Sequence, residues 1–243
     1  MTDVLVLCYH AVSESFPSEL SVGPERLEAQ LRLLIERGYE GVTFAEAVEN
    51  GAGGRKVAVT FDDAYLSVRD LAFPILSRLG LRGTVFAPTE YVGIDGPMSW
   101  PGIDDWVGGP HERELRPMSW EDLRGLADAG WEVGSHTRTH PRLTEVDDDG
   151  ALALELEGSR QACEDRLGRS CPSLAYPYGD VDDRVVAAAR AAGYRQAATL
   201  PARWHQATRL AWPRVWVGPA DDERRFKLKV SRLARGARLV AGR

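Results

Sequence analysis

The sequence predicts an α/β fold built on parallel strands, arranged either as a barrel or as a doubly wound sheet. Short apolar segments of strand character alternate along the chain with segments whose apolar residues recur at helical spacing. Polar clusters begin where several of the apolar segments stop, and parallel α/β folds assemble their chemistry at that rim. The chain has 243 residues, 44% of them hydrophobic, which suits one domain with a sizeable core.

The expected strands are short runs rich in β-branched and aromatic residues. They fall at 4–7, 56–61, 82–88, the residues leading into Ser135, 173–179, 195–200 and 213–217. The expected helices carry an apolar stripe and often a capping residue or a terminal glycine. They fall at 24–38, from Thr43, from Val68 to Gly80, from Ser119 to Gly130, at 147–167 and at 182–193.

Two stretches depart from this alternation. Residues 89–118 are rich in Gly and Pro and show little periodicity, so we expect an irregular functional insertion over the rim. Residues 223–243 hold eight Lys or Arg and one Glu, whereas the whole chain carries a net charge of −6. The sequence therefore divides into an acidic body, 1–222, and a basic tail, and the acidic body argues against nucleic-acid binding.

The tail has two interpretations. Phe226, Val230, Leu233, Ala237 and Val240 follow one helical face, with basic residues around them. This face either packs on the barrel or lies on an anionic membrane surface.

The sequence also predicts a cytoplasmic location. The N-terminus lacks the features of a secretory signal, and the three cysteines do not form a disulfide framework.

Two pairs of residues suggest metal chemistry. Asp62 and Asp63 end an apolar strand, where two carboxylates either cap the next helix or serve a cation and its water. His136 and His140 are spaced i, i+4, which is compatible with one ion or with a structural role. Together, two histidines and a carboxylate suit metal-assisted hydrolysis better than either pair does alone.

The segments "TFDDAY", "SHTRTHPRL" and "AYPYG", in this order, resemble the polysaccharide deacetylases of carbohydrate esterase family four. The resemblance extends over nearly the whole chain. It implies a distorted (β/α)7 barrel of parallel strands with the active site at the C-terminal rim. It also implies metal-dependent removal of the N-acetyl group from an amino-sugar glycan or glycoside.

The resemblance assigns roles to individual residues. One divalent metal ion is expected, with Zn2+ as the default and Co2+, Ni2+ or Mn2+ as alternatives. Asp62 is expected to be the general base, and the backbone N–H of Tyr178 to stabilise the oxyanion. Tyr176, in the same motif, is expected to contact substrate. The expected metal ligands are Asp63, His136 and His140.

The chain departs from the family pattern at two places. Many members carry an arginine that orients the base, but the corresponding residue here is Ala175, so Arg214 is the suggested substitute. Many also carry a late "Leu-x-His" strand whose histidine protonates the leaving amine. One branch, resembling the poly-N-acetylglucosamine deacetylases, has that strand permuted to the N-terminus, which makes His10 the expected acid. His205, in a polar segment, is a weaker candidate.

The substrate is expected to be an N-acetylated amino sugar, with Trp100 and Trp106 of the insertion offering flat apolar faces to it. For a cytoplasmic chain, a nucleotide-linked, lipid-linked or small glycoside intermediate fits better than a finished extracellular polymer. Two alternatives remain open: an amide hydrolase acting on cyclic imides or ureides, and a non-catalytic sugar-binding relative. The presence of both aspartates argues against the first, and the presence of both aspartates and both histidines argues against the second.

Overall fold

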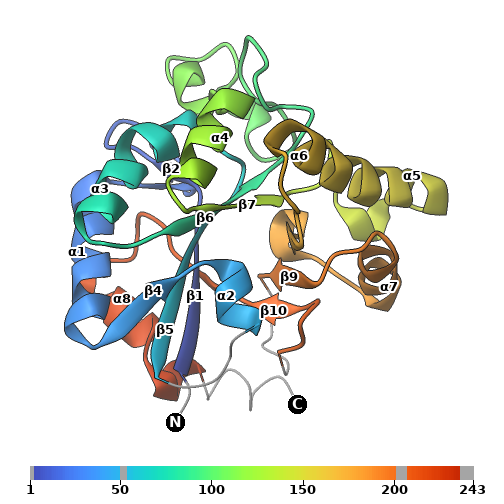
Figure 1. The fold of residues 1–243 in the computed structure, drawn as a ribbon. Coiled ribbons are helices and arrows are strands. Elements are labelled where there is room, and N and C mark those ends of the chain that lie inside the picture. Colours follow the sequence, from blue (N-terminus) through green and yellow to red (C-terminus); the bar gives the residue numbers. More distant parts are fainter. Residues whose placement is uncertain (1–2, 50–53, 201–206, 236–243) are drawn as a thin grey trace.

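The computed structural model describes residues 3–49, 54–200 and 207–235. It confirms the predicted α/β fold: parallel strands form a sheet that is nearly closed into a barrel, with helices outside it (Figure 1). The main strands run in the spatial order β10-β9-β8-β7-β6-β5-β1-β11. They are β1 (Asp3–Tyr9), β5 (Arg55–Phe61), β6 (Gly83–Ala87), β7 (Glu132–Ser135), β8 (Ser173–Ala175), β9 (Gln196–Thr199), β10 (Trp212–Pro213) and β11 (Val215–Trp216).

The barrel closes through one short segment near the C-terminus. β10 pairs with β9, and β11, which begins two residues later, pairs with β1 at the other edge of the sheet. Arg214 lies between these two short strands, and its backbone N–H donates to the carbonyl of Thr199 over 3.0 Å. Arg214 therefore sits at the seam of the barrel.

One strand of the main sheet was missed by the sequence prediction. β4 (Tyr39–Val42) pairs with the first half of β5, whereas β6 pairs with the end of β5 from Val59. The sheet therefore splits beside β5 and the barrel is distorted. β4 is short and reads "YEGV", which gives it neither a continuous apolar run nor a β-branched stretch.

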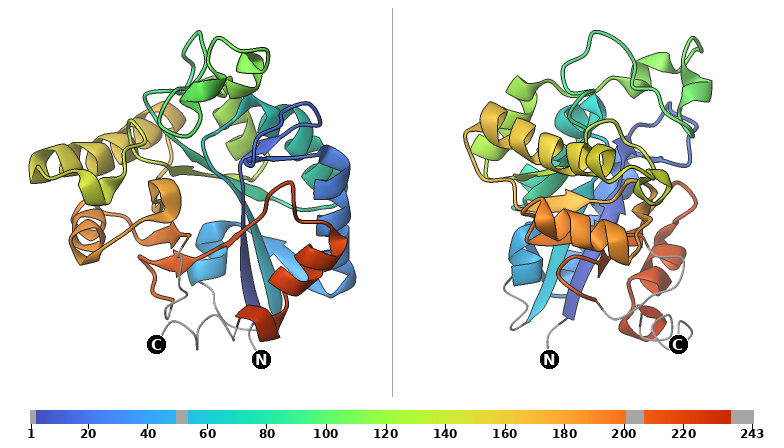
Figure 2. Two further views of the ribbon diagram at one scale, coloured as in Figure 1. Left: turned by 180° about the vertical axis from the view of Figure 1, so that it is seen from behind. Right: turned by 90° about the vertical axis from the view of Figure 1, so that its right-hand side faces the viewer.

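The helices surround the sheet and lie within the ranges predicted from the sequence (Figure 2). Thr43 and Glu46 form a reciprocal capping box, as do Ser119 and Asp122. The helices are α1 (Pro24–Glu36), α2 (Phe44–Glu49), α3 (Phe73–Arg78), α4 (Trp120–Asp128), α5 (Asp149–Ala153), α6 (Ser159–Leu167), α7 (Asp183–Ala191) and α8 (Glu223–Lys229).

Residues 89–118 form an irregular segment with two short 3-10 turns, drawn in green at one end of the barrel in Figure 2. This segment is tied to the loop between the short strands β2 (Ala11–Val12) and β3 (Ser21–Val22). The ring of Phe16 meets Trp106 edge-on at 5.2 Å, and Ser13 donates to Glu114 over 3.0 Å. Aromatic and polar contacts therefore hold the two loops together over the rim.

The described part of the basic tail packs on the barrel beside α1. Phe226 and Val230 are buried in the main core, and Arg235 pairs with Asp3 and donates to the carbonyl of Val4 over 3.1 Å. These contacts favour the packed-helix interpretation for residues 223–235, although Leu233 of the same predicted face is exposed. Ala237 and Val240 lie outside the described residues. Within the described ranges, no helix combines the length and apolar character that a bilayer crossing requires.

Candidate active site

The carboxyl ends of the strands and the two loops above them enclose a cavity of about 460 Å³. It is lined by every site residue expected from the sequence except Arg214 and Tyr176. The loop between β2 and β3 and the insertion supply one wall, and the strand ends supply the floor. The prediction that the polar clusters meet at one rim is therefore matched by the structure.

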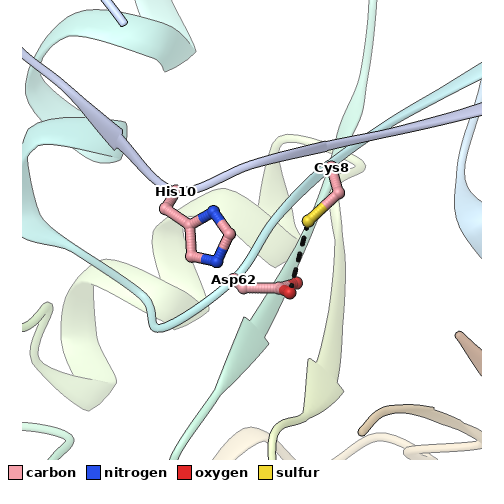
Figure 3. Close-up of side chains that lie close together, drawn as sticks. All are labelled: Cys8, His10 and Asp62. Carbon is pink, nitrogen blue, oxygen red and sulfur yellow. Dashed lines mark hydrogen bonds between the residues drawn. The ribbon is translucent and has the colours of Figure 1, made fainter. Parts of the chain in front are cut away.

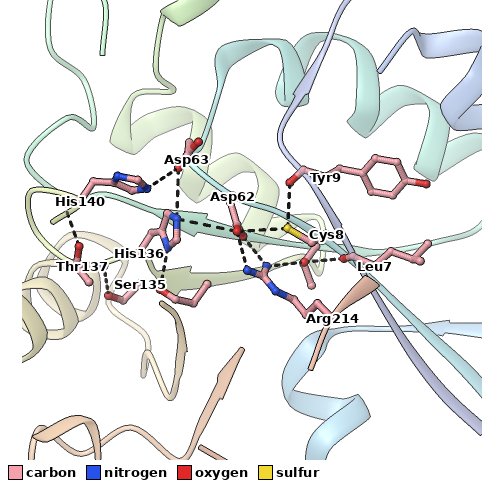
Figure 4. A network of polar contacts seen from close by, with 12 residues as sticks. Leu7, Cys8, Tyr9, Asp62, Asp63, Ser135, His136, Thr137, His140 and Arg214 are labelled. Carbon is pink, nitrogen blue, oxygen red and sulfur yellow. Dashed lines mark hydrogen bonds and ion pairs between the residues drawn. The ribbon is translucent and has the colours of Figure 1, made fainter. Parts of the chain in front are cut away.

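The two aspartates diverge because the backbone changes direction after β5. The N–H of Asp62 still donates to the carbonyl of Tyr9, over 2.9 Å, as a continuation of the sheet. Asp63 and Ala64 then adopt left-handed conformations, with φ of +68° and +53°. This turn sends the Asp63 carboxylate toward the histidines, while that of Asp62 stays beside the seam of the barrel (Figure 4).

Asp63, His136 and His140 bring three donor atoms together within 4.8 Å of one another. Oδ1 of Asp63 lies 3.3 Å from Nε2 of His136 and 3.4 Å from Nε2 of His140 (Figure 4). Nδ1–H of His136 donates to the carbonyl of Ala175 over 2.8 Å, which leaves the Nε2 lone pair available. Oδ1 of Asp63 has no hydrogen-bond partner among the described residues. A buried carboxylate oxygen facing two imidazole nitrogens fits a divalent metal ion.

The backbone around these donors is strained. Every non-glycine residue with positive φ in the described ranges lies at the site: Asp63, Ala64, Thr137, His140 and Tyr178. Such conformations cost free energy and persist where the surroundings hold them in place, as the Thr137 hydroxyl does by accepting the N–H of His140 over 3.1 Å. Strain gathered at one cluster of side chains is typical of a functional site.

The charges of the three residues suit metal binding. Burial raises the pKa of the Asp63 carboxyl, but the close contacts with His136 and His140 and the charge of these imidazoles lower it more, so the net pKa lies well below the usual range. Burial lowers the pKa of His140, and this effect prevails. Burial also lowers the pKa of His136, but the charge of Asp62 and the contact with Asp63 raise it overall. Asp63 is therefore an anionic donor at neutral pH.

Asp62 is held by a different partner. Arg214 donates to Oδ1 of Asp62 over 2.6 Å and to Oδ2 over 2.7 Å, in a fully buried two-pronged ion pair (Figure 4). Burial raises the pKa of Asp62, but Arg214 and His136 together lower it to about 2. Arg214 also donates to the Thr60 hydroxyl over 3.0 Å, which fixes the guanidinium. Arg214 thus makes the contact expected of a substitute for the arginine absent at Ala175.

His10 follows β1 directly and lines the cavity beside Asp62 and Asp63. Its ring is buried, and its Nδ1 has no hydrogen-bond partner among the described residues. Burial lowers the pKa of His10 and outweighs the opposing effect of the two aspartates. The alternative acid, His205, lies outside the described residues.

Comparison with known proteins identifies the family. The family model described as polysaccharide deacetylase matches residues 49–197, which is more than half of the chain. The chain belongs to the polysaccharide deacetylase family. It is 24% identical over 199 residues to YxkH of Bacillus subtilis strain 168, covering 80% of this chain. The chain spans 63% of the length of that relative.

One further relative and one solved structure are also similar to this chain. The chain is 22% identical over 222 residues to the poly-beta-1,6-N-acetyl-D-glucosamine N-deacetylase of Staphylococcus epidermidis, covering 81% of this chain and 72% of the relative. The fold is similar to that of the Streptococcus pyogenes deacetylase PplD, with a TM-score of 0.78, 20% identity and coverage of 94% of this chain and 98% of that one.

The two tryptophans predicted for substrate binding take different positions in this member of the polysaccharide deacetylase family. Trp100 and Trp106 both line the cavity, but the Trp100 ring is buried and stacks on His140 at a centroid distance of 4.3 Å. Tyr178 also lines the cavity, and its hydroxyl donates to the carbonyl of Pro101 over 3.1 Å. Trp100 and Tyr178 therefore support His140 from two sides, since Tyr178 meets the same ring edge-on at 4.9 Å.

The expected substrate contact of Tyr176 is wrong. Its side chain is fully buried in a separate core cluster, and its hydroxyl donates to the carbonyl of Leu210 over 2.9 Å. The backbone turns at Pro177, so Tyr176 and Tyr178 point in different directions and only Tyr178 reaches the cavity.

Cys8 and Trp216 are among the residues at the site that the sequence reasoning missed. Cys8 lies beneath the cavity, where its thiol donates to Oδ2 of Asp62 over 3.4 Å. Trp216 lines the cavity and is paired in register with Cys8 across β1 and β11. The sequence spacing could have indicated both residues. Cys8 is two positions from His10 and Trp216 is two positions from Arg214, and residues two apart in a strand lie on the same face.

Proposed function

We propose that this protein is a metal-dependent N-deacetylase that removes the acetyl group from an N-acetylated amino sugar. The observation that carries the proposal is that the neighbouring carboxylates of Asp62 and Asp63 have different environments. Asp63 presents an oxygen without a hydrogen-bond partner to two histidines, whereas Asp62 is held in place by Arg214. The poly-N-acetylglucosamine deacetylase among its relatives supports the same chemistry.

Asp63, His136 and His140 would hold the ion, which we propose to be Zn2+ because two imidazoles and a carboxylate suit it. A divalent ion bound there would polarise the amide carbonyl of the substrate and lower the pKa of its bound water. His136 is held for this task by its hydrogen bond to Ala175, and His140 by its contacts with Trp100 and Tyr178.

The chain's own residues would carry the proton transfers. Asp62, aligned by Arg214, accepts the proton of the attacking water. The backbone N–H of Tyr178 donates to the developing oxyanion. His10 donates a proton to the departing nitrogen, which is a poor leaving group until it is protonated. The buried positions of Asp62 and His10 limit competing water, and this strengthens each polar contact.

We expect the substrate to bind in the cavity, because its volume of about 460 Å³ is in the range of small-ligand sites. Trp106 and Trp216 offer aromatic surface on its wall, which suits the C–H faces of a pyranose ring. We propose an N-acetylglucosamine-type residue, presented by a glycan or by a smaller intermediate. A cytoplasmic location and contact of the tail with an anionic membrane stay predictions.

The test is release of acetate and a free amine from N-acetylglucosamine oligosaccharides by purified protein. We expect turnover that chelation abolishes and that one equivalent of divalent ion restores. Asp63→Ala is expected to lose the ion, whereas Asp62→Asn is expected to keep it and lose turnover. Hydrolysis of a cyclic imide instead of the glycan would contradict the proposal and favour the imide-hydrolase alternative. Glycan binding without turnover would favour a non-catalytic sugar-binding protein.

A further inference from the structure

A second group of donor atoms lies next to the proposed metal ligands. Cys8, His10 and Asp62 each offer one donor atom, and these atoms lie within 4.8 Å of one another (Figure 3). All three side chains are buried, and none belongs to the group of Asp63, His136 and His140. The deacetylation scheme gives no role to Cys8, so the presence of a thiol at this place needs another account.

The side chains of Cys8 and His10 keep donor capacity beside the Asp62 carboxylate. Nδ1 of His10 has no hydrogen-bond partner in the described part of the chain. The thiol of Cys8 donates to Oδ2 of Asp62, and the two atoms are 3.4 Å apart. A tetrahedral Zn2+ ion with ordinary bond lengths to sulfur and to oxygen would hold these two atoms about 3.6 Å apart. An ion could therefore replace the thiol proton between them with little movement.

We propose that Cys8, His10 and Asp62 form a second metal site that takes thiophilic divalent ions, such as Zn2+ or Cd2+, and inhibits the enzyme when filled. On binding, the thiol proton leaves to solvent, and the ion accepts lone pairs from the thiolate, the imidazole and the carboxylate. Inhibition follows because Asp62 and His10 are the proposed base and acid. This consequence rests on the proposed function, whereas binding of the ion does not.

The surroundings make this site weaker than the neighbouring one. Arg214 already holds the Asp62 carboxylate through two hydrogen bonds, and its positive charge opposes a cation nearby. Burial raises the pKa of the Cys8 thiol well above its usual value, so an entering ion must displace a firmly held proton. The site should therefore fill only with excess metal. Hard ions such as Mn2+ should not fill it, because they bind sulfur poorly.

The experiment is a Cd2+ titration of the metal-loaded protein, followed by ultraviolet thiolate-to-metal charge-transfer absorption and by deacetylase activity. The ligands of the first site include no thiol, so the absorption reports a cysteine ligand independently of turnover. Cys8→Ser and Cys8→Ala are the test variants. Cys171→Ser is the control, because Cys171 precedes β8 and contacts Cys163, so this variant shows whether that pair of buried thiols contributes to the absorption. Mn2+ replaces Cd2+ in a parallel titration of the unaltered protein.

We expect the unaltered protein and Cys171→Ser to gain the absorption while they lose activity. The Cys8 variants should keep the first ion and their activity, lack the absorption, and need at least about tenfold more Cd2+ for the same inhibition. Absorption that Cys8→Ala does not reduce, or equal inhibition of that variant, would overturn the site. Inhibition by Mn2+ as strong as that by Cd2+ would overturn it even if neither variant folds. Cys8-dependent absorption in a protein without deacetylase activity would instead overturn the proposed function and leave the second site standing.

Discussion

Replacing Arg214 with methionine should destabilise the fold by breaking the buried ion pair with Asp62. Both side chains are almost fully buried, and the guanidinium donates to both carboxylate oxygens, over 2.6 and 2.7 Å. Removing one partner of a buried pair leaves an uncompensated charge and typically costs about 3–5 kcal/mol. For a chain of this length, such a loss lowers the melting temperature by roughly 10 °C.

The assay is urea unfolding at neutral pH of Arg214→Met, Asp62→Asn and the double variant. The double variant leaves no lone buried charge. We therefore expect its loss of unfolding free energy to be smaller than the sum of the losses of the two single variants, by about 3 kcal/mol. The exposed pair of Arg78 and Glu28 is the control, and Arg78→Met should cost less than about 1 kcal/mol. A coupling between Arg214 and Asp62 below about 0.5 kcal/mol would refute the reasoning.

Three further predictions concern the acid, the aromatic wall and the tail. His10→Ala should keep the metal and the fold while kcat falls by about 10²–10⁴-fold and the basic limb of the pH–rate profile disappears; nearly full activity would contradict the acid role. Trp106→Ala should raise KM more than it lowers kcat. Trp100→Ala should weaken metal binding, because the Trp100 ring stacks on His140. The same changes in KM and in metal affinity in both variants would contradict these separate roles. Deleting residues 223–243 should lower the melting temperature markedly, because the deletion removes Phe226 from the core; a stable truncated protein that no longer binds anionic liposomes would favour the membrane interpretation instead.

The sequence was sufficient for the fold because apolar runs and helical periodicity are local signals. The elements it missed, such as β4, are too short to carry such a pattern. For the site, adjacency to strand ends placed the aspartates and histidines together at one rim. The partnership of Arg214 with Asp62 was suggested only by the alanine at position 175, since residues more than 150 positions apart meet only when the barrel closes.

The mistaken expectation for Tyr176 has a different cause. "AYPYG" places two tyrosines on either side of a proline, and only the backbone angles decide which ring enters the cavity. Tyr178 adopts φ of +59°, a conformation that the residue type does not favour and that the surrounding contacts impose. The roles of Trp100 and Trp106 were likewise hidden, because stacking on His140 depends on how the insertion folds back over the rim.

The seam of the barrel has a consequence for how the protein would respond to local opening. The strands on either side of Arg214, β10 and β11, are only two residues long. Very few hydrogen bonds therefore join this segment to β9 and β1. Detachment of this segment would withdraw the guanidinium from Asp62 while the strands that carry Asp63, His136 and His140 stayed paired. Heating or mild denaturant should therefore abolish turnover before the metal is released, because detachment of this segment separates the proposed base from Arg214 while the proposed metal ligands stay together.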